Sequence, residues 1–203
     1  MSTDLKFFAE GFSASANLKQ VISNDESVLM ALARISDVCI DALADGHTIY
    51  FFGNGGSAAD AQHIAAELVG TFLDKERPAL RAMALTTDTS ILTSVSNDLG
   101  YDKIFARQIE GLGRSGDVAI GISTSGNSPN VLAGLQAARN KGLVTVGWTG
   151  KGGGEVAACV DHLFAVPHTS TPRIQEIHIT AGHLLCEAIE NAWNTGRIKV
   201  NQR

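Results

Sequence analysis

Hydrophobic residues recur at helical spacing across the first 45 residues of the chain. In the second half of this segment they stand three or four positions apart, as on one face of an amphipathic helix, at Val28, Leu29, Leu32, Ile35, Cys39 and Leu43. We predict two helices, over residues 4–22 and 25–44, with Ser23 and Glu26 forming a capping box at the start of the second. Two helices cannot bury their apolar faces alone, so the pair must pack on the remaining chain or on another subunit.

The pattern changes from Gly46 onward, where short apolar runs alternate with helical segments. The apolar runs, which are typical of strands buried on both faces, cover residues 48–52, 79–85, 118–122, 144–148 and 162–166. The helical segments between them cover 57–70, 103–111, 128–141 and 153–159, and a closing helix covers 172–193. This alternation predicts an α/β fold with a five-stranded parallel doubly wound sheet flanked by helices.

The sequence therefore divides into three parts. Residues 1–45 form the helical pair, residues 46–196 form a single ligand-binding domain, and residues 197–203 form a polar tail that we expect to be frayed. With 203 residues, 44% hydrophobic and 18% charged, the chain can bury a sizeable core. Glycine is in excess, with 21 residues beside only 4 prolines, which predicts tight turns and close backbone approaches rather than a low-complexity tract.

Charge and cysteine content exclude several classes of partner. The formal net charge of −5 and the lack of any lysine or arginine run argue against nucleic acid. No apolar run approaches the roughly 18 residues of a membrane span, and the N-terminus does not have the pattern of a signal peptide. The three cysteines are widely spaced, which favours reduced thiols in the cytoplasm.

Two loops carry the clearest sign of a ligand site. The first predicted strand runs into Gly53-Asn54-Gly55-Gly56-Ser57, and the third runs into Ser123-Thr124-Ser125-Gly126-Asn127-Ser128. Each loop offers backbone N–H groups, hydroxyls and a helix N-terminus, which together bind phosphate without a basic residue. Glycine, serine and asparagine also simply make good turns. Because the carboxyl ends of parallel strands share one edge of the sheet, two such loops together favour an anion site.

Titratable residues follow the first loop. His63 and Glu67 lie four apart, so they share one face of the helix that the loop starts. Further candidates stand on the closing helix, at Gln175, Glu176, His178, His183 and Glu187. A carboxylate and an imidazole near a phosphate anchor suit an aldose–ketose isomerase, which moves a proton between adjacent carbons through an enediol.

In combination these residues resemble the bacterial phosphoheptose isomerases of the sugar isomerase (SIS) superfamily, over most of the chain up to about Trp193. The residues that carry the resemblance are Gly53–Ser57, Ala61-Gln62-His63-x-Ala65-x-Glu67, Asn97-Asp98, Ser123–Ser128, and Arg173–His178 with His183. The resemblance implies conversion of sedoheptulose 7-phosphate to D-glycero-D-manno-heptose 7-phosphate in the cytoplasm, an early step toward activated heptose for lipopolysaccharide or capsule. It also implies a homotetramer in which the N-terminal helices pack between subunits and the active sites lie at subunit interfaces.

The same resemblance assigns roles to single residues. It implies that Glu67 is the catalytic base and His183 the catalytic acid. It implies substrate contacts from Asn54, Gly55, Gly56, Ser57, Glu67, Asn97, Asp98, Ser123, Thr124, Ser125, Ser128 and Gln175. It implies zinc, held by His63, Glu67, Gln175 and His183. Gln175 and His183 are separated by roughly 12 Å of helical rise, so one metal needs a helix that starts or bends between them, or ligands from different subunits.

Two positions depart from the family pattern. Thr71 stands where relatives carry an arginine, and Pro172 stands where related isomerases often carry an acid. Arg77 or Arg81 could supply the missing guanidinium. These departures leave two alternatives open: an isomerase of another sugar phosphate, and a non-catalytic SIS protein that regulates DnaA-dependent replication initiation. The presence of Glu67, His63 and His183 favours an enzyme.

Overall fold

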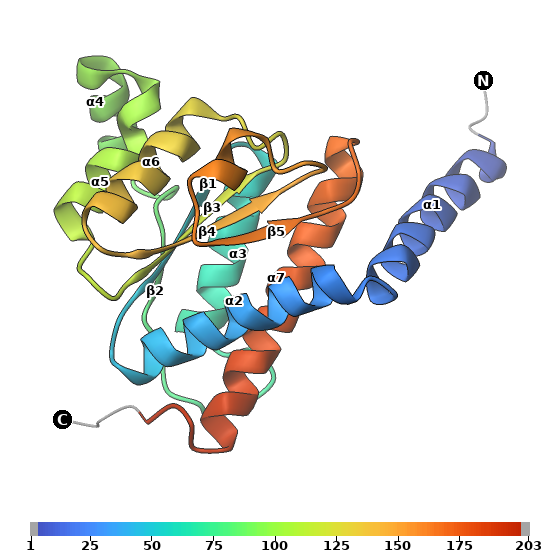
Figure 1. The fold of residues 1–203 in the computed structure, drawn as a ribbon, viewed down its shortest axis with the longest axis horizontal. Helices are drawn as coiled ribbons and strands as arrows, with labels where there is room; N and C mark the ends of the chain where they lie inside the picture. The colour runs from blue at the N-terminus through green and yellow to red at the C-terminus, as the bar shows by residue number, and fades with distance from the viewer. Residues whose placement is uncertain (1–3, 200–203) are drawn as a thin grey trace.

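A five-stranded parallel sheet forms the centre of the computed structural model, which describes residues 4–199 (Figure 1). The strands are β1 (Ile49–Gly53), β2 (Ala82–Ala84), β3 (Val118–Ser123), β4 (Val144–Thr149) and β5 (His162–Ala165), in the order β2-β1-β3-β4-β5. Every neighbouring pair is parallel. The predicted doubly wound α/β fold is therefore confirmed.

Helices cover both faces of the sheet (Figure 1). One face carries α2 (Glu26–Ala44), α3 (Gly56–Val69) and α7 (Thr171–Asn194), while α1 (Leu5–Ser23) projects away from the body and buries Leu18 in the same core. The other face carries α4 (Thr89–Leu99), α5 (Ile104–Leu112) and α6 (Pro129–Asn140). Two short 3-10 helices complete the described elements, η1 (Tyr101–Lys103) and η2 (Gly154–Ala158). No helix in residues 4–199 is long and apolar enough to cross a membrane.

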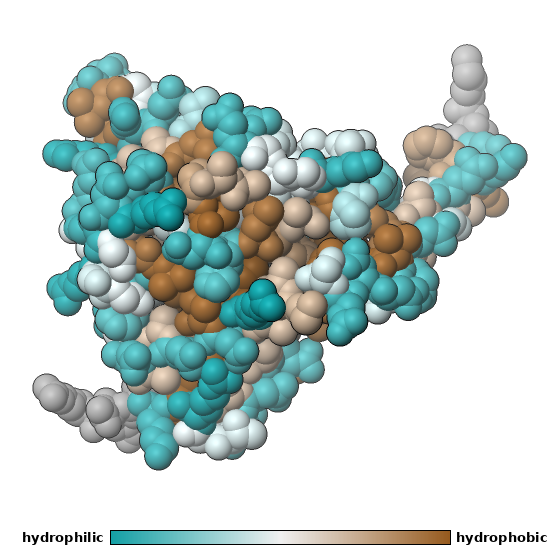
Figure 2. Space-filling view, viewed as in Figure 1, coloured by the Kyte–Doolittle hydropathy of each residue, from teal (hydrophilic) through white to brown (hydrophobic). Residues whose placement is uncertain are grey.

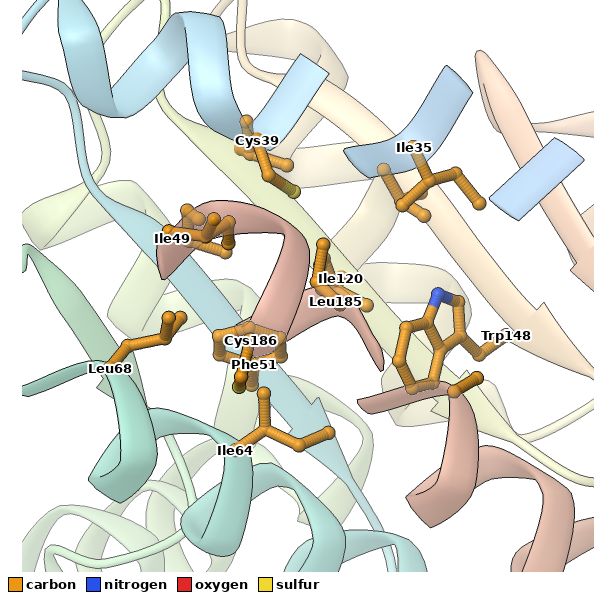
Figure 3. Packing of buried hydrophobic residues seen from close by; sticks show 14 of the residues in the cluster. Ile35, Cys39, Ile49, Phe51, Ile64, Leu68, Ile120, Trp148, Leu185 and Cys186 are labelled. Carbon is orange, nitrogen blue, oxygen red and sulfur yellow. The ribbon is translucent and has the colours of Figure 1, made fainter. Parts of the chain in front are cut away.

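Strand β1 shows how the sheet separates the two cores. Phe51 lies in the core beneath α2, α3 and α7, whereas its neighbours Tyr50 and Phe52 lie in the core beneath α5 and α6. Successive strand side chains point to opposite faces, so a strand buried on both faces reads as one continuous apolar run. Figure 3 shows Phe51 in the core cluster that also contains Ile64 of α3 and Cys186 of α7.

Three local predictions were wrong. The segment 153–159 forms the 3-10 helix η2 instead of an α-helix, and the strand predicted over 79–85 is reduced to the three residues of β2. Helix α4 was missed because its serines and threonines are weak helix formers, and it has no fully buried residue. Its start is fixed by Asp88, which accepts a hydrogen bond from the N–H of Ile91.

The predicted capping box of α2 is also wrong. Asp25 is the N-cap, and its carboxylate accepts hydrogen bonds from the N–H groups of Ser27 and Val28. Ser23 instead donates its hydroxyl to the carbonyl of Gln20 at the end of α1. Asp25 caps the helix in place of Ser23, because one carboxylate satisfies two of the helix's unpaired N–H groups.

The first residues of the predicted polar tail pack against the body. Arg197 pairs with Asp37 and Asp41 of α2 at 2.8 Å each, and Ile198 is only 1% exposed. The expected fraying therefore does not begin at residue 197, and residues 200–203 lie outside the described part.

We expect Asp25→Ala to lower the urea midpoint of unfolding and Ser23→Ala to leave it nearly unchanged. The hydrogen bond from Ser27 lowers the pKa of Asp25 below its ordinary 3.8. A lowered pKa stabilises the fold above that pH, and the contribution disappears as the pH falls through the folded pKa. The difference between Asp25→Ala and the wild type should therefore vanish in acid. A larger loss for Ser23→Ala would contradict this capping pattern.

Candidate active site

The carboxyl ends of β1 and β3 bring the two predicted loops together. These strands are hydrogen-bonded neighbours, with Gly53 of β1 opposite Ile122 of β3. In this strand order the connections leave β1 and β3 in opposite directions, which opens a crevice at the carboxyl ends. The two loops therefore flank the place where this kind of sheet binds its ligands.

Glycine gives the first loop its shape. A Cβ on Gly53 would lie 2.6 Å from the carbonyl oxygen of Ile122, so only glycine fits against β3. Gly55 has a φ of +56° and precedes α3 with no side-chain cap. The first N–H groups of α3 are thus left without a side-chain acceptor, as an anion site requires. The amide of Gln175, from α7, packs directly against Gly56.

An amide network ties the first loop to the second. The side chains of Asn54 and Asn130 exchange two hydrogen bonds of 2.8 Å, and Tyr101 donates its hydroxyl to the Asn54 oxygen at 2.9 Å. Asn130 begins the helix after the second loop and is 2% exposed. In this structure Asn54 therefore joins the two loops. Sequence reasoning missed Asn130 and Tyr101, because nothing local marks a pairing across 76 residues.

In the second loop, serine hydroxyls hydrogen-bond to one another, and Gly126 packs against the segment behind the loop. Ser123 shares a hydrogen bond with Ser128 at 2.9 Å and a longer one with Ser125 at 3.4 Å. Gly126 has a φ of +69°, and a Cβ there would overlap the carbonyl oxygen of Gly153. The N–H of Val156 donates to the Gly126 carbonyl at 3.0 Å, so the segment around η2 supports the loop from behind.

The predicted acid–base residues form one cluster on α3 and α7. His63 Nε2 lies 3.2 Å from Glu67 Oε1 and 2.9 Å from His183 Nε2. The ring of Phe72 stacks on His183 with centroids 5.9 Å apart. His63 is exposed and Glu67 and His183 are half-buried, so the cluster is open to a ligand. No sequence pattern predicts that Phe72 takes part.

The cluster also fits a metal ion. Ligand atoms of His63, Glu67 and His183 all lie within 4.8 Å of one another. Zinc at about 2.0 Å from each ligand atom separates neighbouring ligands by roughly 3.3 Å, close to the separations found here. Two imidazoles and one carboxylate are a common zinc donor set, which leaves a fourth position for water or substrate.

Gln175 lies apart from this cluster. Helix α7 is continuous from Thr171 to Asn194, so Gln175 is about 12 Å from His183 along the helix axis. Within one chain, Gln175 contacts Gly56 of the first loop, whereas His183 contacts His63 in the cluster. A metal site that includes Gln175 therefore needs a second subunit.

Asn97 and Asp98 stand at the end of α4, exposed to solvent. The Asn97 amide donates to the Asp98 carboxylate at 2.7 Å. Three residues later, Tyr101 reaches the first loop through Asn54. The structure thus joins this segment to the loops, while the side chains of Asn97 and Asp98 remain accessible.

Other titratable candidates have different environments. His178 is fully buried, and its Nε2 donates to the Thr149 carbonyl at 3.1 Å; burial lowers its pKa to about 4, so it is a neutral core residue. Glu176 pairs with Arg173 at 2.7 Å, and Glu187 is exposed. Asp60, one turn before His63, has a pKa raised to about 6, because burial outweighs the opposing charge of His63.

Neither Arg77 nor Arg81 replaces the arginine that is missing at Thr71. Arg77 is buried beside Glu190, and Arg81 donates from Nε to the Thr48 hydroxyl at the amino end of β1, opposite to the loops. Thr71 itself is exposed. The expectation that a nearby arginine compensates is therefore wrong for the described chain.

Comparisons with known proteins identify the family of the chain. The SIS domain family model matches residues 12–150. A phosphoheptose isomerase of Nitratidesulfovibrio vulgaris is 59% identical over 149 residues, covering 73% of this chain and 71% of the relative. One of Sulfurimonas denitrificans is 48% identical over 91% of this chain and 94% of the relative.

Solved structures give the same result. A phosphoheptose isomerase from Neisseria gonorrhoeae is 41% identical with a TM-score of 0.85, covering 92% of this chain and 98% of that one. A phosphoheptose isomerase from Francisella tularensis is 32% identical with a TM-score of 0.89, covering 94% and 100%. The chain belongs to the phosphoheptose isomerase family of SIS-domain proteins.

Proposed function

We propose that the chain isomerises sedoheptulose 7-phosphate to D-glycero-D-manno-heptose 7-phosphate, an early step toward activated heptose. The observation that carries the proposal is the Glu67–His63–His183 cluster in a chain 46–63% identical to phosphoheptose isomerases. A regulatory protein that only binds sugar phosphates would not need this acid–base group. The three cysteines are free in the structure, which agrees with a reducing cytoplasm.

The loops provide the anchor for the substrate. Hydroxyls of Ser123, Thr124, Ser125 and Ser128, with the N-terminus of α6, hold the phosphate. Gly55, Gly56, Ser57 and Gln175 bind sugar oxygens beside the first loop, with Asn54 holding the loop in place. Asn97 and Asp98 contact further hydroxyls. Backbone N–H groups and hydroxyls carry this recognition, so an acidic protein can bind an anion.

Proton transfer belongs to the cluster. The Glu67 carboxylate removes a proton from carbon 1 of the ketose and returns it to carbon 2 of the enediol. His183 gives a proton to the carbonyl oxygen at carbon 2 and takes back the hydroxyl proton at carbon 1 as the new aldehyde forms. The net reaction moves hydrogen within the substrate and needs no external oxidant or reductant.

Zinc fits His63, Glu67 and His183 by the chemistry and spacing of these side chains. When bound, it would polarise the substrate oxygens at carbons 1 and 2. His63 would then serve as a ligand whose Nε2 faces both Glu67 and His183. A nitrogen of His183 that binds metal cannot also donate a proton, so metal and proton compete for this residue.

Distances along α3 favour a site shared between subunits. Glu67 lies eleven residues after Gly56, which is about 16 Å of helical rise. A seven-carbon sugar phosphate spans roughly 10 Å, given C–C bonds of about 1.5 Å. One substrate cannot easily reach both the first loop and Glu67 of the same chain. We therefore place loops and cluster from different subunits around one substrate, in a homotetramer.

Helix α1 supplies the surface for that assembly. It projects from the body, and Figure 2 shows hydrophobic atoms along this arm (Figure 1). Leu5, Phe7 and Phe12 are 83%, 68% and 79% exposed, which is unusual for a monomer surface. We assign residues 1–45 to oligomerisation on this basis.

Purified protein should convert sedoheptulose 7-phosphate to the aldose, followed by NMR. Glu67→Gln should keep the fold and lower kcat by about 10²–10⁴-fold, because the amide cannot accept the proton. Glu187→Gln, exposed on α7, is the matched control and should retain turnover. No turnover by wild-type protein, with or without added zinc, would refute the proposed function, and near-native turnover by Glu67→Gln would remove it from the base role.

Metal-stripped protein should bind one Zn²⁺ per chain in a titration against a chromophoric chelator. His63→Ala should weaken that binding by more than about tenfold, because one of three clustered ligands is lost. His162→Ala removes a histidine on β5, outside the cluster, and should bind zinc like the wild type. Equal affinity for the two variants would contradict the zinc site.

Phe7→Ser combined with Phe12→Ser should convert the tetramer to smaller species, measured by light scattering after size exclusion. The apolar area that drives association is lost. Lys6→Ser with Glu10→Ser changes the same helix at its exposed ion pair and should keep the native mass. A tetramer in the variant with Phe7→Ser and Phe12→Ser would show that the apolar face of α1 does not hold the assembly, and loss of the tetramer in the control would show that apolar burial is not the specific cause.

A further inference from the structure

A buried ion pair joins α7 to the end of α3. Arg77, in the connection between α3 and β2, lies 3.1 Å from Glu190 of α7. Each residue is 4% exposed. Replacing such a pair by apolar residues often leaves a protein as stable or more stable. Stability alone is therefore a weak reason for a chain to keep one.

All five N–H groups of the Arg77 guanidinium are used. Nε donates to Glu190, Nη1 donates to the carbonyls of Leu68 and Pro78, and Nη2 donates to the carbonyls of Glu67 and Gly70. The last carbonyls of a helix lack partners within it, and a cation is favoured there. Arg77 thus closes the end of α3 and holds the backbone of Glu67 itself, at 2.8 Å.

Glu190 holds the segment that follows α3. Its second carboxylate oxygen accepts the N–H groups of Leu73 and Asp74 at 2.9 and 3.1 Å. The preceding residue is Phe72, whose ring stacks on His183. Glu190 lies seven residues after His183, two turns along the same face of α7. One carboxylate therefore fixes the segment that covers His183.

The thiol of Cys186 is buried on α7, one turn before Glu190. Burial raises its pKa to about 12, and the charges of Glu67, Arg77 and Glu190 all act on it. Because Arg77 donates to the main-chain oxygen of Glu67, the ion pair and the proposed base adjoin one another. Arg77, almost fully buried and with every donor used, cannot itself touch the substrate.

From this geometry we infer that the Arg77–Glu190 pair is a positioning device, which holds Glu67 in register with His183 and Phe72. The inference rests on the proposed roles of Glu67 and His183. A displacement of about 1 Å at a catalytic group can cost 10²-fold in rate. Loss of the pair should therefore reduce the rate of the chemical step more than the binding of substrate.

The test compares Glu190→Gln with Asp117→Asn. Asp117 is an equally buried carboxylate, 3% exposed, which accepts the N–H groups of Thr48 and Arg114 at 2.8 Å each, at the opposite end of the sheet. Both variants should lose stability. Well below both melting midpoints, Glu190→Gln should lower kcat at least about tenfold with KM within about threefold, whereas Asp117→Asn should keep the wild-type kcat.

Two further measurements make the result decisive. Hydrogen exchange at residues 66–70 should speed up in Glu190→Gln and not in Asp117→Asn. Arg77→Lys, which keeps the charge but loses the planar fork, is the second variant if Glu190→Gln does not fold, with the same expected kcat loss. A rise in KM alone, or a kcat equal to that of Asp117→Asn, would overturn the inference. If the wild type does not turn over, the proposed function fails, and unchanged exchange at 66–70 overturns the positioning role independently.

Discussion

The close contact of α3 with α7 is the constraint on which the site depends. A Cβ on Gly182 of α7 would lie 2.7 Å from side-chain carbons of Ile64 on α3, so the helices approach as closely as they do only with glycine there. The residues adjacent to this contact in the chain, His63 and His183, consequently meet at 2.9 Å between their Nε2 atoms. Because the helices run in the same direction, the contact at Gln175 and Gly56 precedes that of the histidines. One packing geometry thus sets the positions of both the first loop and the cluster within each chain.

Recognition of an anion by an acidic chain follows from the loops. The net charge is −5, and neither loop contains lysine or arginine. Backbone N–H groups and hydroxyls at two helix N-termini take the place of basic side chains. Glycine is needed both in the second loop and in the segment behind it. Gly126 of the loop packs on Gly153, and Gly152, Gly153 and Gly154 all have positive φ. Part of the glycine excess therefore belongs to the support behind the loop.

Local sequence patterns predict much of the fold and the two loops. Buried parallel strands appear as continuous apolar runs, and helix-starting loops end in small polar residues, so the sheet and both loops were predicted from the sequence. Residues such as Asn130, Arg77 and Glu190 act through partners 76 to 117 residues away, and no single-sequence pattern records such pairings. The cap of α2 shows the same limit at short range, because Asp25 and Ser23 both fit a capping position and geometry decides between them.

Thr71 and Pro172 are the two positions at which the chain departs from the family pattern. The α3 end of the cluster has no guanidinium at residue 71, and Arg77 touches only the main-chain oxygen of Glu67. The side chain next to the Glu67 carboxylate is His63, at 3.2 Å. Pro172 lies in the first turn of α7, where proline fits without loss of a helical hydrogen bond. Both positions lie outside the three-residue cluster, so neither changes the side chains to which we assign the proton transfer.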